Sequence, residues 1–177
     1  MARLGLRNTR GFSLIELSML LAMTAVVAAI AVPVLTDSMH GMQLLSEARK
    51  IATTMSYAKI GATSQLTSYQ LAFDLDNNQW RVLKRNRATG NWEQQQDMNR
   101  LSLGMANSAI AFKTSSDSAP TGFSGTSATT IIFNARGIPA GAAVVYLSNE
   151  DTDYAVSVSI AGKVQIWRLG NNGWDPV

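Results

Sequence analysis

The sequence lacks cysteine, and His40 is the only histidine among its 177 residues. Without cysteine the chain has no disulfide, no thiol nucleophile and no cysteine metal ligand. A Ser/His/Asp triad would have to use His40, and the sequence has no Gly-x-Ser-x-Gly, His-Glu-x-x-His or phosphate-loop pattern. The composition therefore argues against an enzyme, and we expect neither a cofactor nor a metal site.

Residues 1–11 contain no acidic residue but hold three of the fifteen basic residues, Arg3, Arg7 and Arg10. The sequence pI of about 9.4 depends largely on this segment. Without residues 1–11, twelve basic residues balance twelve acidic ones. Overall charge therefore gives no support for a nucleic-acid partner, and none is expected.

A long uncharged run, Leu17–Leu35, follows the arginines and is nineteen residues long. A helix of about 20 apolar residues spans a bilayer. Because the arginines precede the run and the next charge is Asp37, the positive-inside bias places the N-terminus in the cytoplasm and the rest of the chain outside.

A carboxylate, Glu16, stands at the start of this apolar segment, within the stretch RGFSLIEL at residues 10–17. A charge at the bilayer centre costs about 2.5–3.5 kcal/mol, and less near the interface, so such a residue usually has a partner. An ordinary secretory signal has a shorter apolar core and gains nothing from a carboxylate there. Glu16 therefore needs another explanation.

The stretch RGFSLIEL resembles the class III signal of type IV prepilins and type II secretion prepseudopilins. The resemblance implies that a prepilin peptidase/methyltransferase removes a leader, residues 1–11, by cutting between Gly11 and Phe12, and then methylates Phe12. Residues 12–35 would be the transmembrane and assembly helix. Inner-membrane lipid and other pilin or pseudopilin subunits would be the partners, and the domain would be periplasmic before it reaches the filament or cell surface.

The same resemblance assigns roles to Glu16 and Pro33. Glu16 of an incoming subunit would neutralise the amine of Phe12 of its neighbour. A close pair at low dielectric matters because loss of one partner leaves an uncompensated charge, at a cost of about 3–5 kcal/mol. Pro33 matches the helix-bending proline of the family, since proline lacks an amide donor and clashes with the preceding turn. Pro33 fits equally well as a residue that only marks where the helix leaves the membrane.

The remaining residues, 36–177, read as one α+β domain. Apolar residues at three- and four-residue spacings predict an amphipathic helix to about residue 64. Alternating apolar residues then predict a hairpin of 69–75 and 80–84, and later strands at 129–133, 143–147, 154–160 and 164–167. Residues 115–127 are rich in Ser, Gly and Thr and predict a surface loop. We expect the long helix to pack on an antiparallel sheet, as in a pilin.

Two short motifs, Phe133-Asn134-Ala135-Arg136-Gly137 and Gly162-Lys163-Val164, resemble the H-type minor pseudopilin and minor pilin group. This implies a minor structural subunit that joins, or initiates at the tip of, a type IV pilus-like filament. A minor pseudopilin of a type II secretion system shares every one of these features and remains an alternative. A DNA-uptake pilin is a third hypothesis.

One basic cluster outside the leader, Arg81, Lys84, Arg85 and Arg87, would serve that third hypothesis as a phosphate-contacting patch. Charges that keep a hairpin edge soluble explain it better. Two acidic stretches, Asp74-x-Asp76-x-Asn78 and Glu150-Asp151-x-Asp153, contain calcium-type ligands, but neither completes a calcium loop. We interpret both as solvated turns.

Overall fold

The computed structural model describes residues 12–95, 101–103, 110–149 and 152–177. The chain divides into two compact units, one ending at Met39 and one running from His40 to Val177. Helix α1 (Leu14–Ser64) contributes to both units. The expected α+β class is confirmed. The strands, however, form two antiparallel sheets where the sequence suggested one.

The second unit begins with the amphipathic part of α1, which ends at Ser64 as predicted. One stripe of the helix is fully buried because its apolar residues recur at the helical period. It consists of Leu44, Ala48, Ile51, Met55, Ala58 and Ala62. Leu45 and Ala52 are partly buried beside it, so the predicted apolar face is confirmed.

The first sheet contains the predicted hairpin, β1 (Tyr69–Asp74) and β2 (Gln79–Arg85). Its order is β3-β2-β1-β6, with β3 (Trp92–Gln94) and β6 (Thr130–Phe133) outermost. A short strand, β4 (Leu101–Ser102), also pairs with β2. In the hairpin, Phe73 is opposite Trp80. Period-two alternation places Leu71, Trp80 and Val82 on the buried face.

The second sheet has the order β10-β9-β8-β7-β5. Its strands are β5 (Ala111–Lys113), β7 (Ala143–Ser148), β8 (Asp153–Val158), β9 (Val164–Gly170) and β10 (Gly173–Pro176). The sequence predicted β7, β8 and the start of β9. It did not predict β5 or β10, which are short and lack a clear alternation.

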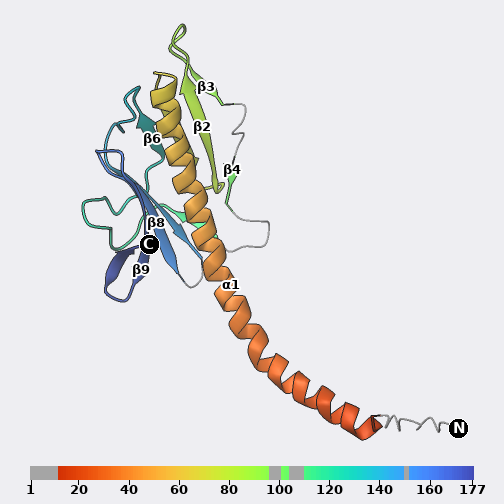
Figure 1. Cartoon of the computed structure of the whole chain (residues 1–177). Coiled ribbons are helices and arrows are strands. Elements are labelled where there is room, and N and C mark those ends of the chain that lie inside the picture. Colours follow the sequence, from red (N-terminus) through yellow and green to blue (C-terminus); the bar gives the residue numbers. More distant parts are fainter. Residues whose placement is uncertain (1–11, 96–100, 104–109, 150–151) are drawn as a thin grey trace, which may run out of the picture. The chain divides into compact units, whose positions relative to one another are not determined.

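The two sheets share one core with α1, and Figure 1 shows the helix of this unit lying across both. Three rings join the sheets: the centroid of Phe112, on β5, lies 5.8 Å from that of Phe73 and 6.0 Å from that of Trp80. Both contacts are edge-to-face, which aromatic pairs favour. The two sheets therefore meet in one main core.

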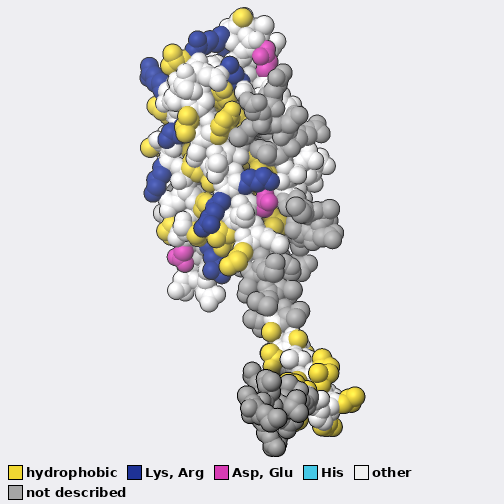
Figure 2. Space-filling model, turned by 45° about the vertical axis from the view of Figure 1, so that its right-hand side comes forward, with side chains coloured by type: hydrophobic (Ala, Val, Ile, Leu, Met, Phe, Trp, Pro, Cys, Tyr) yellow, Lys and Arg dark blue, Asp and Glu magenta, His cyan; other side chains and the backbone are white. Residues whose placement is uncertain are grey.

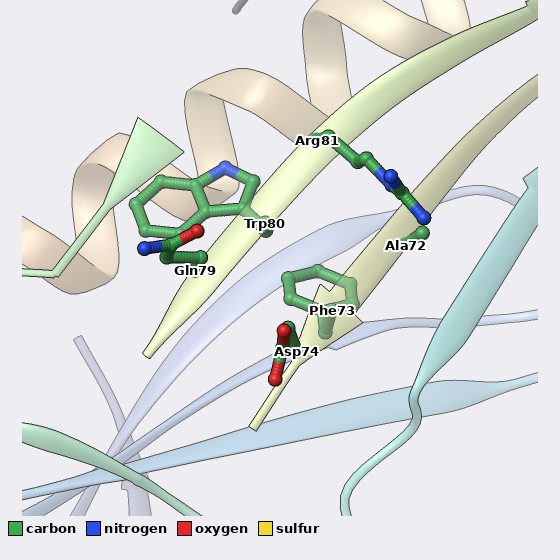
Figure 3. A pocket seen from close by; sticks show the side chains of 6 residues that line it. All are labelled: Ala72, Phe73, Asp74, Gln79, Trp80 and Arg81. Carbon is green, nitrogen blue, oxygen red and sulfur yellow. The ribbon is translucent and has the colours of Figure 1, made fainter. Parts of the chain in front are cut away.

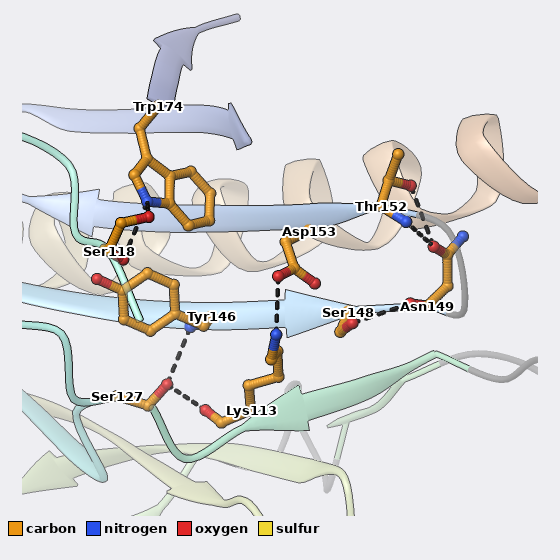
Figure 4. A network of polar contacts seen from close by, with 9 residues as sticks. All are labelled: Lys113, Ser118, Ser127, Tyr146, Ser148, Asn149, Thr152, Asp153 and Trp174. Atoms are coloured by element: carbon orange, nitrogen blue, oxygen red, sulfur yellow. Dashed lines mark hydrogen bonds and ion pairs between the residues drawn. The ribbon is translucent and has the colours of Figure 1, made fainter. Parts of the chain in front are cut away.

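A second, smaller cluster lies on β7 and β8 and consists of Val144, Tyr146 and Ala155, with Phe123, Trp167 and Trp174 packed against it. Figure 4 shows the hydrogen bonds that connect the predicted loop, residues 115–127, to Tyr146 and Trp174 of this cluster. Ser127 Oγ donates to the carbonyl of Lys113 and accepts from the Tyr146 amide at 3.0 Å. Trp174 Nε1 donates to the Ser118 carbonyl at 3.0 Å. The Ser/Gly/Thr-rich segment is thus anchored at both of its ends.

Candidate functional site

The apolar part of α1, Leu14–Ala31, is the one segment among the described residues that is long and apolar enough to cross a membrane, with a mean hydropathy of 2.2. Every residue from 12 to 31 is exposed. Leu14 is 87% exposed and Ile15 is 73% exposed, values that no soluble surface helix would sustain along a whole face. The segment therefore needs a lipid or protein environment.

The polar side chains of this segment differ in how they are satisfied. Ser18 Oγ donates to the Ile15 carbonyl at 2.8 Å, and Thr24 Oγ1 donates to the Leu21 carbonyl at 2.9 Å. Such bonds hide a hydroxyl within the helix itself. Glu16, in the first turn, forms no ion pair among the described residues. Its carboxylate is thus the charged group of the segment that a partner would have to meet.

The other residues of the predicted signal are only partly covered by the structure. Gly11 lies outside the described residues. Phe12 is 76% exposed and precedes α1, which begins at Leu14. Pro33 lies within α1. Cleavage at Gly11, methylation of Phe12 and the roles of Glu16 and Pro33 remain predictions.

The two glycine motifs meet on the domain part of α1, at a place we call the glycine junction: Gly137, Gly162, Lys59 and Thr63. Gly137 (φ 74°) and Gly162 (φ 76°) both adopt left-handed backbone conformations, which glycine adopts without strain. A Cβ on Gly162 would lie 3.0 Å from the Gly137 carbonyl oxygen. A Cβ on Gly137 would lie 2.8 Å from Thr63 Cγ2. Both positions therefore need glycine for space as well as for conformation.

Lys59 connects α1 to the second turn of this junction by a hydrogen bond. Its Nζ donates to the Gly162 carbonyl at 2.8 Å across 103 residues of sequence. Gly162 itself is held in its turn by a 2.7 Å bond from its amide to the Ser159 carbonyl. The sequence motifs that suggested an H-type subunit thus meet at one contact between the helix and the two turns. Nothing in the local pattern around Lys59 pointed to this role.

The predicted basic cluster is divided by the fold. Arg81 and Arg85 alternate with buried Trp80 and Val82, so they share the outer face of β2 as expected. Lys84 lies one position out of phase and is half-buried, opposite Tyr69 and Glu93 on its neighbouring strands. Figure 2 shows Lys and Arg side chains spread over the face of the domain that it presents, with no single dense patch.

Arg87 forms hydrogen bonds at the C-terminal end of α1. Its guanidinium donates to the Gln65 carbonyl at 2.8 Å and also to the Leu66 carbonyl. These carbonyls follow the last turn of α1, where cations and donors are stabilising. Arg85 is likewise engaged through Nε with the Gly90 carbonyl at 3.3 Å. The cluster therefore holds the hairpin and the helix end in place, and the fold brings only Arg81 and Arg85 onto one open face.

A small hollow of about 190 Å³ lies at the end of the β1–β2 hairpin, between Ala72, Asp74, Gln79 and Arg81. Figure 3 shows Asp74 beside Phe73 and Arg81 extending past Ala72. Asp74 accepts from the Asn77 amide at 3.1 Å and from Asn77 Nδ2 at 2.9 Å, which closes the turn.

Two residues of the acidic stretches, Asn78 and Asp153, form contacts within the fold. Asn78 Oδ1 accepts from the Phe112 amide at 2.8 Å, so the calcium-like spacing of this turn serves the fold. Asp153 pairs with Lys113 at 2.7 Å, as Figure 4 shows. Glu150 and Asp151 lie outside the described residues. Within the described part of the chain, no group of three His, Cys, Asp or Glu side chains is placed to hold a metal ion.

Comparison with known proteins gives the chain its relatives. Residues 47–162 match the family model described as type II transport protein GspH. The minor pseudopilin EpsH from the type 2 secretion system of Vibrio cholerae shares the fold with a TM-score of 0.55 at 12% identity, over 73% of this chain and 99% of EpsH. The type IV minor pilin FimU of Pseudomonas aeruginosa gives a TM-score of 0.52 at 16% identity, over 75% and 92%. No curated protein matches the sequence.

The family match covers well over half of the chain and runs from the amphipathic helix to the second glycine of the junction. The fold, with one long helix on antiparallel sheets, is that of EpsH and FimU. The chain therefore belongs to the GspH family of type II transport proteins.

Proposed function

We propose that this minor pilin-type subunit is made as a precursor and assembles into, or initiates, a filament of the type IV pilus or type II secretion kind. The prepilin peptidase removes residues 1–11 and methylates Phe12. The helix then holds the subunit in the inner membrane, with its N-terminus cytoplasmic and the domain from residue 36 periplasmic. A lipid environment accounts for the uncovered apolar helix, and the arginine-rich leader accounts for the orientation.

The observation that carries this proposal is the carboxylate of Glu16, which lies in the apolar segment Leu14–Ala31 and has no ion-pair partner among the described residues. Ser18 and Thr24 bond to their own helix, whereas Glu16 forms no ion pair among the described residues. Cleavage after Gly11 would create an amine at Phe12, four positions before Glu16. That amine on a neighbouring subunit is the complementary charge, and its pairing with Glu16 would set the register of the two helices.

Mass spectrometry of the protein from cells that contain the peptidase tests this processing. We expect an N-terminus at Phe12 that carries one methyl group. A Gly11→Val variant should keep its leader, because a bulky residue blocks the cut. The matched control is Gly5→Val, which changes a glycine inside the leader and should be processed normally. Retention of Met1 in the natural product, or a terminus beyond Ala31, would overturn the proposal.

A pilus and a secretion filament differ in the machine around the subunit. The family model that matches is a type II transport protein, which favours the secretion system. Co-purification of the filament with its secretin and secreted hydrolases would support that assignment. Loss of retractile pili on deletion of the gene, with secretion intact, would instead assign the chain to a pilus.

A further inference from the structure

The residue that ends α1 in a left-handed conformation is a leucine. The Thr67 amide donates to the Ala62 carbonyl at 3.1 Å. The Leu66 amide donates to the Thr63 carbonyl at 3.3 Å, which completes the two bonds of a Schellman motif. The left-handed position of this motif is usually glycine, but here it is Leu66, with a φ of 49° and a side chain that is 65% exposed. Neither the backbone nor the core therefore accounts for a leucine at this position.

A hollow of about 280 Å³, which we call the helix-end hollow, lies beside Leu66. Gln65 and Thr67, the sequence neighbours of Leu66, line it together with residues 84–87 and Glu93. Figure 1 shows the end of α1 and the loop that follows β2 at the same end of this unit. Three of the lining residues are basic: Lys84, Arg85 and Arg87. Neither ion pair in the described part of the chain involves them.

The guanidinium of Arg87 is held in place but only partly used. Its Nη2 donates to the Gln65 carbonyl at 2.8 Å and also to the Leu66 carbonyl. Its Nε and Nη1 bond to no described residue. A planar guanidinium matches the geometry of a carboxylate, and one that is already held in place loses little entropy on binding. Arg87 is therefore prepared to donate to a carboxylate.

One acidic residue, Glu93, also lines the helix-end hollow. Its Oε1 accepts from Asn86 Nδ2 at 2.6 Å. Asn86 Oδ1 in turn accepts from the Ala88 and Thr89 amides at 2.8 and 3.2 Å, so Glu93 helps to hold the loop after β2. Because three basic residues line the hollow with this one carboxylate, the hollow keeps a positive charge that attracts anions.

Two exposed apolar side chains adjoin these charged residues. Trp92 is 38% exposed and lies directly opposite Arg85 in the β2–β3 pair, and directly opposite residues present their side chains on the same face. Leu66 adjoins the hollow between Gln65 and Thr67. A small inorganic anion would use the cations but neither apolar side chain. A ligand that uses both joins a carboxylate to an apolar group, as a polypeptide segment does.

We propose that the helix-end hollow docks a segment of a partner protein that carries a carboxylate next to an apolar side chain. The carboxylate accepts from Arg87 and pairs with Lys84 and Arg85, and the apolar side chain packs on Leu66. A nucleic acid would need a longer row of phosphate contacts than one hollow offers. The site depends neither on leader processing nor on Glu16, so its failure would leave the proposed filament function untouched.

A peptide-display experiment on the full chain in detergent tests the site. Linear random peptides are selected on the wild-type protein, and the enriched peptides are synthesised as probes. We expect sequences in which Asp or Glu stands beside Leu, Ile or Phe. A selection that enriches no peptide, or only peptides without an acidic residue, would overturn the proposal. So would a single-stranded oligonucleotide that binds more tightly than the peptides.

The Leu66→Asn variant separates docking from folding. Asparagine adopts the left-handed conformation more readily than leucine, so this variant should unfold at the same or a higher denaturant concentration than the wild type. Its peptide binding should nevertheless weaken about tenfold. Ile160→Asn is the matched control, because Ile160 is 68% exposed and does not line the hollow; it should bind as the wild type does. Equal peptide binding by Leu66→Asn and the wild type would overturn the proposal.

Charge variants test the anion preference without removing Arg87, which holds the helix end. The Lys84→Gln, Arg85→Gln double variant should bind the peptides about tenfold more weakly. The Arg81→Gln, Arg136→Gln double variant removes two exposed charges elsewhere and should bind normally. Glu93→Gln keeps an acceptor for Asn86 but removes the one negative charge, so it should bind more tightly. Weaker binding by Glu93→Gln, or equal losses in the two double variants, would contradict the proposal.

Discussion

The ammonium group of Lys59 lies 2.8 Å from the carbonyl oxygen of Gly162 and donates a hydrogen bond to it. The bond joins the last turns of α1 to the start of β9, and Gly137 packs against the same place. A hydrogen bond from a charged donor is stronger than a neutral one. The glycine junction therefore connects α1 to the turn after β6, which holds Gly137, and to the turn before β9, which holds Gly162.

Replacement of Lys59 by methionine should lower the free energy of unfolding by about 1–2 kcal/mol, because it removes a charged donor and leaves the Gly162 carbonyl unpaired. Chemical denaturation of the purified protein measures this. Lys163→Met is the matched control, since Lys163 is exposed and its side chain bonds to no described residue. Equal effects of the two variants would show that the bond does not stabilise the fold.

Because Gly162 is crowded as well as left-handed, its replacement by alanine should lower the free energy of unfolding more than the backbone conformation alone would. Alanine at a positive φ is strained by about 1 kcal/mol or more, and at Gly162 its Cβ would also lie 3.0 Å from the Gly137 carbonyl. At Gly122 (φ 87°), an added Cβ would meet no atom within 4 Å. We therefore expect Gly162→Ala to destabilise the protein by roughly 1–2 kcal/mol more than Gly122→Ala, as measured by thermal or chemical unfolding.

Tyr69 and Tyr146 predict a loss of stability at alkaline pH. Burial raises the pKa of both phenols above 10.0, and for Tyr69 the nearby Tyr57 raises it further. Because the folded-state pKa exceeds the unfolded one, this stabilisation is complete below pH 10.0 and is lost as the pH rises through the folded-state pKa. Tyr69→Phe should therefore flatten the fall in stability above that pH.

At neutral pH the same two tyrosines should differ. The Tyr69 hydroxyl is buried and bonds to no residue in the described part of the chain, so Tyr69→Phe should be neutral or slightly stabilising. The Tyr146 hydroxyl donates to the Ser124 carbonyl at 2.7 Å, so Tyr146→Phe should cost about 1 kcal/mol. A pH series of urea unfolding curves on both variants measures the two effects together.

The charge on Glu16 should matter for assembly but not for processing. Glu16→Gln keeps the shape of the side chain and removes its charge, which would leave the Phe12 amine of the neighbour unpaired at a cost of about 3–5 kcal/mol. We expect normal leader removal by mass spectrometry and a large loss from the sheared filament fraction. Glu47→Gln, in the domain part of the helix, should assemble normally. Normal incorporation of Glu16→Gln would remove the pairing role.

The divided basic cluster predicts weak DNA binding. Only Arg81 and Arg85 share an open face, and Arg87 is held by the helix end. Two phosphate contacts give little affinity at physiological salt. A gel-shift titration of the full chain in detergent should show no tight complex. Tight, salt-sensitive binding that Arg81→Glu and Arg85→Glu abolish would favour the DNA-uptake hypothesis instead.

Local periodicity was enough to predict much of the fold. The buried stripe from Leu44 to Ala62, the hairpin around Phe73 and Trp80, and β7 and β8 follow from apolar spacings that depend on a few neighbouring residues. Short strands such as β5 and β10 carry too few residues for such a pattern. The division into two sheets also left no mark on the sequence, because strand order depends on pairing between distant segments.

The sequence by itself determined the apolar helix and the amphipathic part that follows, because each depends on the spacing of nearby residues. Only the tertiary structure decided that Gly137 and Gly162 meet at Lys59 and that Arg87 bonds to the carbonyls that follow the helix end. Lys59 and Gly162 are 103 residues apart in the sequence and Arg87 and Gln65 are 22 apart, so neither contact follows from a pattern of neighbouring residues.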